Sequence, residues 1–498
     1  MLSIFKLDAY KINHIKQYPK GTEYIYANLT PRSFKWFDDF WTNTYKEKVK
    51  KIAISRNLLE YTIEKLKEEW DKNFFEVSWS NILKEIKVFE SNTNVSLKHL
   101  MKPYQQLHQL GYLPLKIEIL DNNKSLDYHW FKENTPVMTI TNTLPKFYWL
   151  VNYIETWLSS EYWSLLVIDN ISYQLKLLSA SYLLKTYARR RMADDFNQIL
   201  ETQFHDFSQR GLSSTESAIK SGIAHLNNFS GSDTIPAIME MAKYPHIFTN
   251  KKLLSPIATE HSVMEYGGEE KEIDVWNRLL DTYPKQTLSV VSDTFNYWNV
   301  LTNILPQLKE KIVKRPANAP LVIRPDSSIP INIICGTDNP KLKGTEWEEA
   351  EIKGTLRLLD ELFGHTLTET GHKLLNKVRV IYGDGITPKV AKEIFEKVDN
   401  MGYSTANIIL GVGSFTFQHI TRDTLGIAMK TTAIKVKGKD WEMLYKDPIT
   451  DTGLKKSRKG FINVRPDGEV VDNIPNPIAL EKEQEENGTL WLKLMENN

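Results

Sequence analysis

Short apolar runs in the middle of the chain set the pattern from which its fold can be predicted. Four of them end in polar residues or glycine: Thr287 to Ser292 before Asp293, Leu321 to Ile323 before Arg324, Val378 to Tyr382 before Gly383, and Asn407 to Leu410 before Gly411. Continuous β-branched runs are typical of strands buried on both faces, and intervals of roughly 25 to 60 residues leave room for a returning helix. The pattern predicts parallel βα units.

Glycine and aspartate are also ordinary turn residues, so any single run ending this way fits a plain turn. Four runs together favour a different interpretation, because the carboxyl ends of parallel strands carry the ligand sites of barrels and open α/β sheets. We therefore expect a binding site at these ends.

The two ends of the chain have a different pattern of apolar and polar residues. Residues 115–120 and 136–141 alternate apolar and polar positions, and residues 45–71 are rich in Lys and Glu in a helical pattern. Near the C-terminus, residues 461–464 and 470–471 flank the turn Pro466-Asp467-Gly468, which predicts a β-hairpin. We expect an α+β domain over residues 1–165, completed by residues 435–498, and a βα domain over residues 166–434.

Composition places the chain among folded, soluble proteins. A length of 498 residues predicts two or more packed units, and 41% hydrophobic with 25% charged residues excludes wholesale disorder. Lys and Arg number 63 against 62 acids, so a net charge of +1 gives no global field to collect nucleic acid or anionic lipid. Any anion site must be local, and we expect no nucleic-acid partner.

The single cysteine, Cys335, cannot form an internal disulfide, and the start Met1 to Asp8 lacks the unbroken apolar stretch of a signal peptide. The apolar region 147–168 is interrupted by Asn152, Glu155 and Glu161, which favours packed helices over a membrane span. These features predict a cytoplasmic protein without a membrane partner.

The residues at the strand ends suggest a phosphorylated sugar as ligand. Gly383-Asp384-Gly385 and Gly411-Val412-Gly413 allow backbone N–H groups to approach a phosphate, although neither matches the Walker or dinucleotide pattern. Carboxylates can hold Mg²⁺ and ribose hydroxyls, while cations hold phosphate oxygens. The candidate set is Asp233, Asp293, Asp326 and Asp384 with Arg210, His261 and Arg324.

Plainer roles stay open for these residues. Each aspartate could be a turn or helix cap, and His261 after Glu260 could be a hydrogen-bonded core histidine. No histidine pair has metal-ligand spacing, so the sequence does not indicate zinc.

Nine colinear segments resemble one family, the nicotinamide phosphoribosyltransferases. They are residues 8–19, 205–211 (HDFSQRG), 230–234 (SGSDT), 259–262 (TEHS), 290–293 (VVSD), 323–327 (IRPDS), 380–385 (VIYGDG), 418–423 (QHITRD) and 446–448 (KDP) with the basic loop that follows. The resemblance covers nearly the whole chain. It implies the irregular (β/α) TIM-like barrel of type II phosphoribosyltransferases and an α+β domain built from N- and C-terminal segments.

The resemblance also implies an activity, substrates and an assembly. The family transfers the 5-phosphoribosyl group of phosphoribosyl pyrophosphate to nicotinamide, giving nicotinamide mononucleotide in NAD salvage. It implies Mg²⁺, ATP as phosphoryl donor to His261 beside Glu260, and a homodimer with shared active sites.

Residue roles carry over by matched position. Phe207 and the partner's Tyr10 would sandwich the nicotinamide ring, with Asp233 and Arg324 at its carboxamide. Asp293 and Asp326 would serve the ribose and, through pyrophosphate, Mg²⁺. The resemblance places the remaining residues around phosphoribosyl and pyrophosphate groups: Arg32, Arg210, Ser289, Gly383, Asp384, Gly413, Ser414, Arg422 and Lys455.

Two points limit the match. Ser414 and Phe415 replace glycines of the family's phosphate loop, which affects the detailed phosphate contacts. The nearest alternatives are nicotinate or quinolinate phosphoribosyltransferase, and a relative without catalysis is a further one. Asp233 argues against a substrate that carries a carboxylate, because like charges repel.

Overall fold

The computed structural model describes residues 1–33, 51–121, 129–189, 195–450 and 456–496. The chain forms two compact units: the first joins Met1–Asn170 to Ile420–Asn498, and the second is Ile171–His419. The barrel-like unit therefore ends at His419 rather than at 434, and residues 420–434 belong to the first unit.

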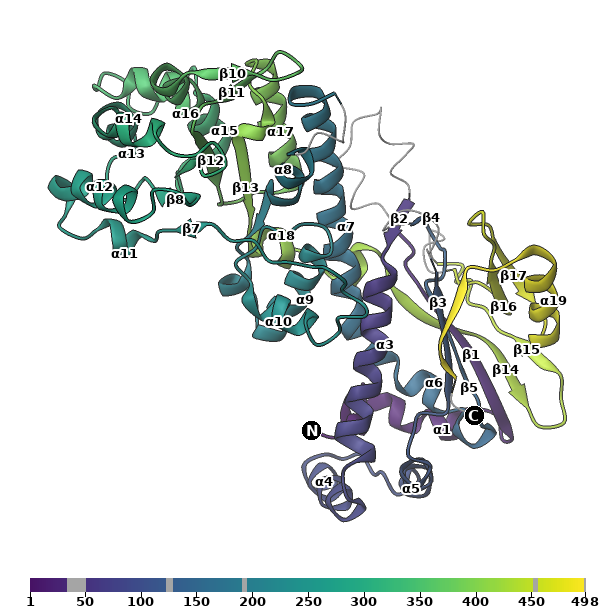
Figure 1. The fold of residues 1–498 in the computed structure, drawn as a ribbon. Helices are drawn as coiled ribbons and strands as arrows, with labels where there is room; N and C mark the ends of the chain where they lie inside the picture. Colours follow the sequence, from purple (N-terminus) through teal and green to yellow (C-terminus); the bar gives the residue numbers. More distant parts are fainter. Residues whose placement is uncertain (34–50, 122–128, 190–194, 451–455, 497–498) are drawn as a thin grey trace. The chain divides into compact units, whose positions relative to one another are not determined.

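The first unit is built on a six-stranded antiparallel sheet to which both ends of the chain contribute (Figure 1). The strand order is β15-β14-β1-β5-β3-β18. Their bounds are β1 (Thr22–Thr30), β3 (Leu115–Leu120), β5 (Met138–Asn142), β14 (Ala428–Val436), β15 (Trp441–Met443) and β18 (Trp491–Glu496). The sheet confirms the predicted α+β architecture made from N- and C-terminal segments.

A hairpin and a helix near the C-terminus pack on this sheet. The hairpin predicted around residues 466–468 is present as β16 (Phe461–Val464) and β17 (Val470–Ile474). Its Phe461 and Ile474 are buried with Tyr26 of β1 and Leu480 of α19 (Pro477–Asn487). The charged segment 481–486 is thus the polar part of a helix whose first turn is anchored.

The expected helix over residues 45–71 is partly wrong. Residues 45–50 lie outside the described residues, and residues 51–54 form a strand, β2 (Lys51–Ile54), which pairs with β4 (His129–Lys132). The helix is α3 (Arg56–Trp70). The run Ile52-Ala53-Ile54 is buried and carries two β-branched residues, so sheet pairing overrides the helical charge pattern beside it.

The first unit also contains these helices. They are η1 (Ser3–Phe5), η2 (Ala9–Asn13), α1 (His14–Gln17), η4 (Asp71–Phe75), α4 (Trp79–Asn92), α5 (Met101–Leu110), η5 (Pro145–Phe147), α6 (Leu150–Tyr153) and η10 (Arg422–Thr424). The boundary between the units falls within the long helix α7 (Glu155–Thr186). Within the described residues, no helix is long and apolar enough to span a membrane.

The second unit contains a parallel sheet of order β6-β13-β12-β9-β8-β7. The bounds are β6 (Phe204–Asp206), β7 (Ile257–Ala258), β8 (Leu288–Val291), β9 (Leu321–Arg324), β12 (Val378–Tyr382) and β13 (Ile408–Val412). The four apolar runs of the sequence are thus the four adjacent strands β8, β9, β12 and β13, which confirms the parallel βα prediction.

Irregular backbone connects the two edges of this sheet. Asp206 of β6 bridges Ser232, and Gly231 bridges Leu254, three residues before β7. Both bridges are parallel, so backbone outside the named strands continues the parallel pairing from β6 toward β7, at the other edge of the sheet. This agrees with the irregular barrel that the resemblance implies.

Helices follow the strands, as the βα pattern requires (Figure 1). Local signals explain their starts: Thr387 caps α17 by accepting from the Val390 N–H, and Pro388 occupies its first position. The helices are α8 (Phe196–Thr202), η6 (Gln209–Gly211), α9 (Thr215–Leu226), α10 (Ile235–Met241), α11 (His261–Met264), η7 (Glu269–Lys271), α12 (Glu272–Thr282), α13 (Tyr297–Asn299), η8 (Val300–Ile304), α14 (Leu305–Val313), α15 (Pro330–Cys335), α16 (Glu348–Phe363), α17 (Pro388–Asn400), η9 (Thr405–Asn407) and α18 (Ser414–Gln418). A hairpin of β10 (His365–Leu367) and β11 (Lys373–Leu375) follows α16.

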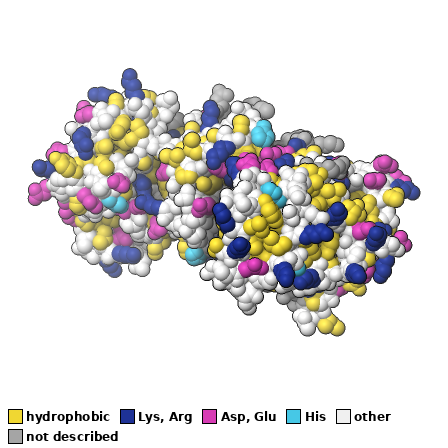
Figure 2. Space-filling model, turned by 90° about the horizontal axis from the view of Figure 1, so that it is seen from below, with side chains coloured by type: hydrophobic (Ala, Val, Ile, Leu, Met, Phe, Trp, Pro, Cys, Tyr) yellow, Lys and Arg dark blue, Asp and Glu magenta, His cyan; other side chains and the backbone are white. Residues whose placement is uncertain are grey.

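The face of the molecule drawn in Figure 2 agrees with the balanced composition. Figure 2 shows Lys and Arg side chains interspersed with Asp and Glu over the face drawn, without a large area of one sign. Anion binding must therefore depend on particular residues, as the sequence predicts.

Candidate active site

A polar pocket of about 530 Å³ opens in the second unit where β6 ends. Its lining comes from the loop after β6, the start of α9 and the loop before α10: Phe207, Gln209, Arg210, Leu212, Ser214, Thr215, Asp233 and Thr234. Three residues predicted from the sequence, Phe207, Arg210 and Asp233, thus share one cavity. Its position at a strand carboxyl end is the one predicted.

Asp206, at the end of β6, fixes the walls of this pocket. Its carboxylate is fully buried and accepts hydrogen bonds from Thr234 Oγ1 at 2.7 Å and Ser232 Oγ at 3.3 Å. Its other oxygen accepts from the Ser208 N–H at 2.9 Å, and its carbonyl accepts from the Asp233 N–H at 3.0 Å. One buried side chain therefore holds both loops that carry Phe207 and Asp233, a role that the sequence reading did not assign.

The Phe207 ring lies against the glycines of two strand ends. A Cβ placed on Gly411 would lie 2.4 Å from Cδ2 of Phe207, and one on Gly383 would lie 3.0 Å from the same atom. The Arg324 guanidinium carbon lies 5.4 Å from the ring centroid. Phe207 and Arg324, both predicted at the substrate ring, thus lie close together, and Gly383, which was predicted at a phosphate, lies against the same ring; the two glycines leave room for the Phe207 side chain.

We expect Gly411→Ala to displace the Phe207 ring, because a separation of 2.4 Å is far inside van der Waals contact. The affinity for a flat aromatic substrate should fall by about tenfold or more, since ring stacking contributes roughly 0.5–1.5 kcal/mol beyond burial and the pocket also changes shape. Binding titrations measure this. Gly383→Ala, at 3.0 Å, is the matched control with a smaller expected loss; equal affinities in both variants would contradict the platform.

Two acids meet at the ends of neighbouring strands β8 and β9. The Asp326 N–H donates to Asp293 Oδ2 at 3.0 Å, and Arg324 Nη2 donates to Asp326 Oδ2 at 2.8 Å. Asp293 Oδ1 and Arg324 Nε are buried without a hydrogen-bond partner among the described residues. A buried carboxylate oxygen and a buried guanidinium N–H left unpaired are costly, so both fit groups that complete themselves on a ligand.

The oxygen atoms of the same two acids, Asp293 and Asp326, are of the kind that Mg²⁺ prefers as ligands. The ion prefers carboxylate oxygens, keeps several waters and is held by one or two carboxylates plus substrate phosphates. Asp293 Oδ1 is such a free oxygen. Within the part of the chain that the structure describes, no cluster of three or more His, Cys, Asp or Glu side chains forms a metal cage. The donor set therefore fits an ion that is shared with a substrate.

Asp233 faces the pocket with one oxygen already occupied. His205 Nε2 lies 3.0 Å from Asp233 Oδ1, and Ser255 Oγ donates to the same oxygen at 2.7 Å. Partial burial acts to raise the pKa of this carboxyl, but the hydrogen bond from His205, the one from Ser255 and the charge of Arg324 together hold the pKa below its usual value. Asp233 is therefore an ionised acceptor at neutral pH. His205 lies in the matched segment 205–211, whereas Ser255 lies outside the matched segments.

His261 begins the short helix α11 and is exposed. Its Nδ1 lies 3.0 Å from Thr294 Oγ1, the residue after Asp293. Glu260 instead accepts from Ser262 Oγ, and the described residues show no ion pair between Glu260 and His261. The structure thus links His261 to the strand end that carries Asp293, through a threonine that the sequence reading did not single out.

The remaining residues predicted for this unit lie at or near strand ends. A Cβ on Gly211 would lie 2.3 Å from Ser414 Oγ, so the Arg210 loop and the predicted phosphate loop are in contact. Gly413 precedes α18, and Asp384 is exposed after β12. Ser289 differs, because it is buried inside β8 in register with Val322.

Tyr10, Arg32 and Arg422 belong to the first unit, and Lys455 lies outside the described residues. Tyr10 exposes 62% of its surface, which leaves the ring free to contact another molecule. Arg32 and Arg422 act on Lys430: burial lowers the pKa of Lys430, the charge of Glu155 raises it, and the charges of Arg32, Lys446 and Arg422 lower it. Lys430 is therefore a further candidate anion ligand, which the sequence did not indicate.

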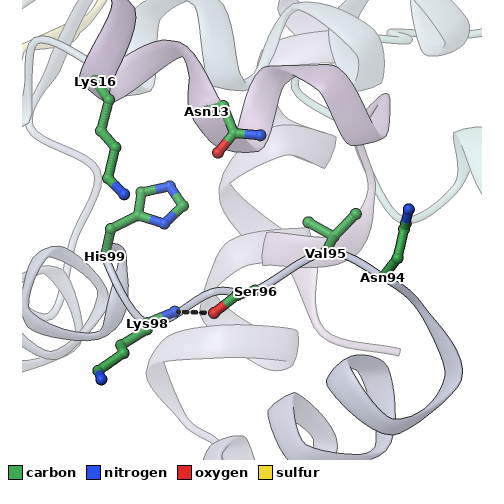
Figure 3. A pocket seen from close by; sticks show the side chains of 7 residues that line it. All are labelled: Asn13, Lys16, Asn94, Val95, Ser96, Lys98 and His99. Atoms are coloured by element: carbon green, nitrogen blue, oxygen red, sulfur yellow. Dashed lines mark hydrogen bonds between the residues drawn. The ribbon is translucent and has the colours of Figure 1, made fainter.

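A second pocket of about 620 Å³ lies in the first unit, between the N-terminal helices and the loop before α5 (Figure 3). Lys16 and His99 point into it, and His99 Nε2 lies 2.9 Å from the Ile12 carbonyl. Lys98 is exposed at its edge. None of the described residues predicted for the active site lines this pocket.

Comparison with known proteins identifies the class. A family model described as "Nicotinate phosphoribosyltransferase (NAPRTase) family" matches residues 202–482, and one described as "Nicotinamide phosphoribosyltransferase, N-terminal domain" matches residues 3–88. The first match covers more than half of the chain. The chain therefore belongs to the NAPRTase family of phosphoribosyltransferases, which are pentosyltransferase enzymes, and the resemblance stated from the sequence is confirmed.

Individual relatives narrow the comparison. A protein of Acinetobacter baylyi named nicotinamide phosphoribosyltransferase is 37% identical over 92% of this chain and 87% of its own length. One of the same name from Mycoplasma pneumoniae is 35% identical over 89% of this chain and 92% of its own length. The solved structure of human nicotinic acid phosphoribosyltransferase covers 93% of this chain and 86% of that chain, with 12% identity and a TM-score of 0.49.

Proposed function

We propose that this protein transfers the 5-phosphoribosyl group from phosphoribosyl pyrophosphate to nicotinamide, giving nicotinamide mononucleotide and pyrophosphate in NAD salvage. The observation that carries the proposal is the ionised Asp233 carboxylate in the Phe207 pocket, with one oxygen open to a substrate N–H. A nicotinate carboxylate would meet a like charge there and would lack the N–H donor, and a site built for such a donor rejects analogues by roughly 10⁴-fold.

No catalytic base is needed for this reaction. The pyridine nitrogen of nicotinamide carries a free lone pair, which attacks C1′ of the ribose as the bond to pyrophosphate breaks. Phe207 and Arg324 orient the ring, and Asp293 and Asp326 hold ribose hydroxyls and stabilise the positive charge that develops. Mg²⁺, held through Asp293 and pyrophosphate with Asp326 beside it, would neutralise charge on the leaving group. Catalysis is therefore positioning and electrostatics.

The strand ends and the resemblance each supply candidate ligands for the phosphate groups. Arg210 and Ser414 lie on touching loops, with Gly383, Asp384 and Gly413 on the ends of β12 and β13 for the 5′-phosphate. Arg32, Arg422 and Lys455 are the proposed pyrophosphate ligands, and Lys430 joins them because the charges of Arg32 and Arg422 act on it.

The function is tested by supplying purified protein with phosphoribosyl pyrophosphate, Mg²⁺ and either nicotinamide or nicotinic acid. We expect kcat/KM for nicotinamide to exceed kcat/KM for nicotinic acid by orders of magnitude, because the Asp233 carboxylate accepts the amide N–H and repels a second carboxylate. Faster turnover of nicotinic acid would overturn the proposal, and absence of turnover with both substrates would do so as well.

We further propose a homodimer in which Tyr10 of one copy completes the site of the other. Exposed apolar side chains support it: Ile235 and Met239 lie on one face of α10, directly after the pocket residues Asp233 and Thr234, and expose 63% and 61% of their surface. An exposed apolar face beside a functional pocket is typical of an interface. A monomer in sedimentation velocity at assay concentration would contradict this.

ATP is the third proposed partner, as phosphoryl donor to His261. Thr294 holds Nδ1, which orients the imidazole, and the exposed position lets a nucleotide reach it. Glu260 would act on the nucleotide or its metal rather than on the ring, since its partner is Ser262.

We expect His261→Ala to abolish the effect of ATP on the apparent KM while leaving turnover without ATP within about threefold, because His261 is not among the residues that line the pocket. Initial rates with and without ATP measure this. His246→Ala, an exposed histidine elsewhere in the unit, is the control. An ATP effect that persists in His261→Ala would show that the phosphohistidine idea is wrong.

A further inference from the structure

The two carboxylate oxygens of Asp233 are not equivalent. Oδ1 has two partners, His205 Nε2 at 3.0 Å and Ser255 Oγ at 2.7 Å. Oδ2 has no hydrogen bond to any described residue. The Asp233 side chain lines the pocket, and 46% of it is exposed. One oxygen is thus held by the protein and the other is presented to a ligand.

His205 is fixed more firmly than the aspartate it holds. It is the middle residue of β6 and exposes only 3% of its surface. Its ring centroid lies 4.7 Å from that of Phe207, and a Cβ on Gly231 would lie 3.1 Å from its Nδ1. Because the His205 ring is packed between the Phe207 ring and the backbone at Gly231, it cannot rotate away from Asp233.

We propose that His205 is a positioning residue which, with Ser255, turns Asp233 so that Oδ2 alone faces the substrate, and thereby sets the preference for a pyridine carboxamide over a pyridine carboxylate. This inference deepens the proposed function and rests on it. His205 touches the aspartate and the ring platform rather than the reacting atoms, so its effect falls on selectivity. The charge-assisted hydrogen bond is strong enough to matter, since such bonds are about twice as strong as neutral ones.

Acidity gives a second readout. The hydrogen bond from His205 lowers the pKa of Asp233, whereas partial burial raises it. The other groups that act on this carboxyl are Ser255 and Arg324, with Arg210 across the pocket. Without the hydrogen bond from His205, fewer groups counteract the effect of burial, so the pKa of Asp233 rises. The ionised acceptor is then lost at a higher pH than in the wild type.

The experiment compares His205→Phe with His205→Gln. Phe fills the space without a donor, and Gln can place an N–H near the former Nε2. For His205→Phe we expect the nicotinamide to nicotinate ratio of kcat/KM to fall by about 10- to 100-fold, the range for one hydrogen bond to a charged group. The acid limb of the nicotinamide pH profile should move to higher pH. His205→Gln should recover most of both properties.

If the buried position of His205 does not tolerate Phe, Ser255→Ala is a second test. Ser255 is exposed, and its replacement should not affect folding. The substitution removes the second donor, and we expect the ratio to fall by about tenfold. An unchanged ratio in folded His205→Phe, or in Ser255→Ala, would overturn the inference, as would equal losses with Phe and Gln. A wild type that does not convert nicotinamide would remove the proposed function itself, so the two failures are distinguishable.

Discussion

Asp233→Asn is expected to lower kcat/KM for nicotinamide by about 10³-fold and to raise the relative rate with nicotinic acid, on the scale known for lost polar recognition. His205 and Ser255 both donate to the position of Oδ1, so the amide oxygen of the introduced asparagine will occupy it. The amide NH₂ then takes the place of Oδ2 and faces the substrate. It meets the NH₂ of nicotinamide donor to donor, but it can donate to a carboxylate.

Steady-state rates with both pyridines, together with thermal unfolding, measure this result. Asp338→Asn, at an exposed aspartate of the same unit, is the matched control. Removing the charge of Asp233 should cost little stability, because 46% of its side chain is exposed and water can solvate the amide. An equal collapse of stability and activity would instead identify a structural aspartate.

Asp293→Asn is expected to reduce kcat/KM for phosphoribosyl pyrophosphate by about 10²- to 10³-fold and to raise the Mg²⁺ concentration needed for half-maximal rate. Asp293 Oδ2 accepts the Asp326 N–H, so the amide oxygen should keep that bond. The NH₂ group then replaces the buried, unpaired Oδ1, the oxygen that is proposed to hold Mg²⁺. A donor in the place of a metal ligand opposes binding of the ion.

Rates measured against Mg²⁺ concentration, with the same Asp338→Asn control, test this expectation. Folding stability should change little, because a buried, unsatisfied carboxylate oxygen is replaced by a neutral amide group that is also buried without a partner. A Mg²⁺ dependence identical to that of the wild type would show that Asp293 does not meet the ion. Loss of activity together with lower stability would assign it a structural role instead.

Parts of the fold were predictable because their signals are local. The runs that became β8, β9, β12 and β13 are apolar over most of their length, which is typical of strands buried on both faces. The hairpin of β16 and β17 followed from its Pro466-Asp467-Gly468 turn. By contrast, β2 was interpreted as helix, because its partner β4 lies about 75 residues away and pairing at such a distance leaves no mark in the local pattern.

The residues of the candidate site likewise fall into some that the sequence predicted and some that it did not. Phe207, Asp233, Arg324 and Asp326 were found from segments whose residue types match a family, and the structure brings them together. The roles of the residues that hold them were not predicted: Asp206 lies in the matched segment 205–211 without an assigned role, and Ser255 and Thr294 look like any turn or cap residue. Their roles depend on distances between loops that are separate in the sequence.

The sequence by itself predicted that parallel strands deliver acids, an arginine and glycines to one end of a sheet, since burial and turn chemistry depend on the residue at each position. Only the tertiary structure decided which oxygen of Asp233 is free, why Gly411 must lack a side chain, and that the charges of Arg32 and Arg422 act on Lys430. These facts arise where distant segments meet. Hydrogen bonds and contact distances there follow from the packing of the whole unit, which no local pattern encodes.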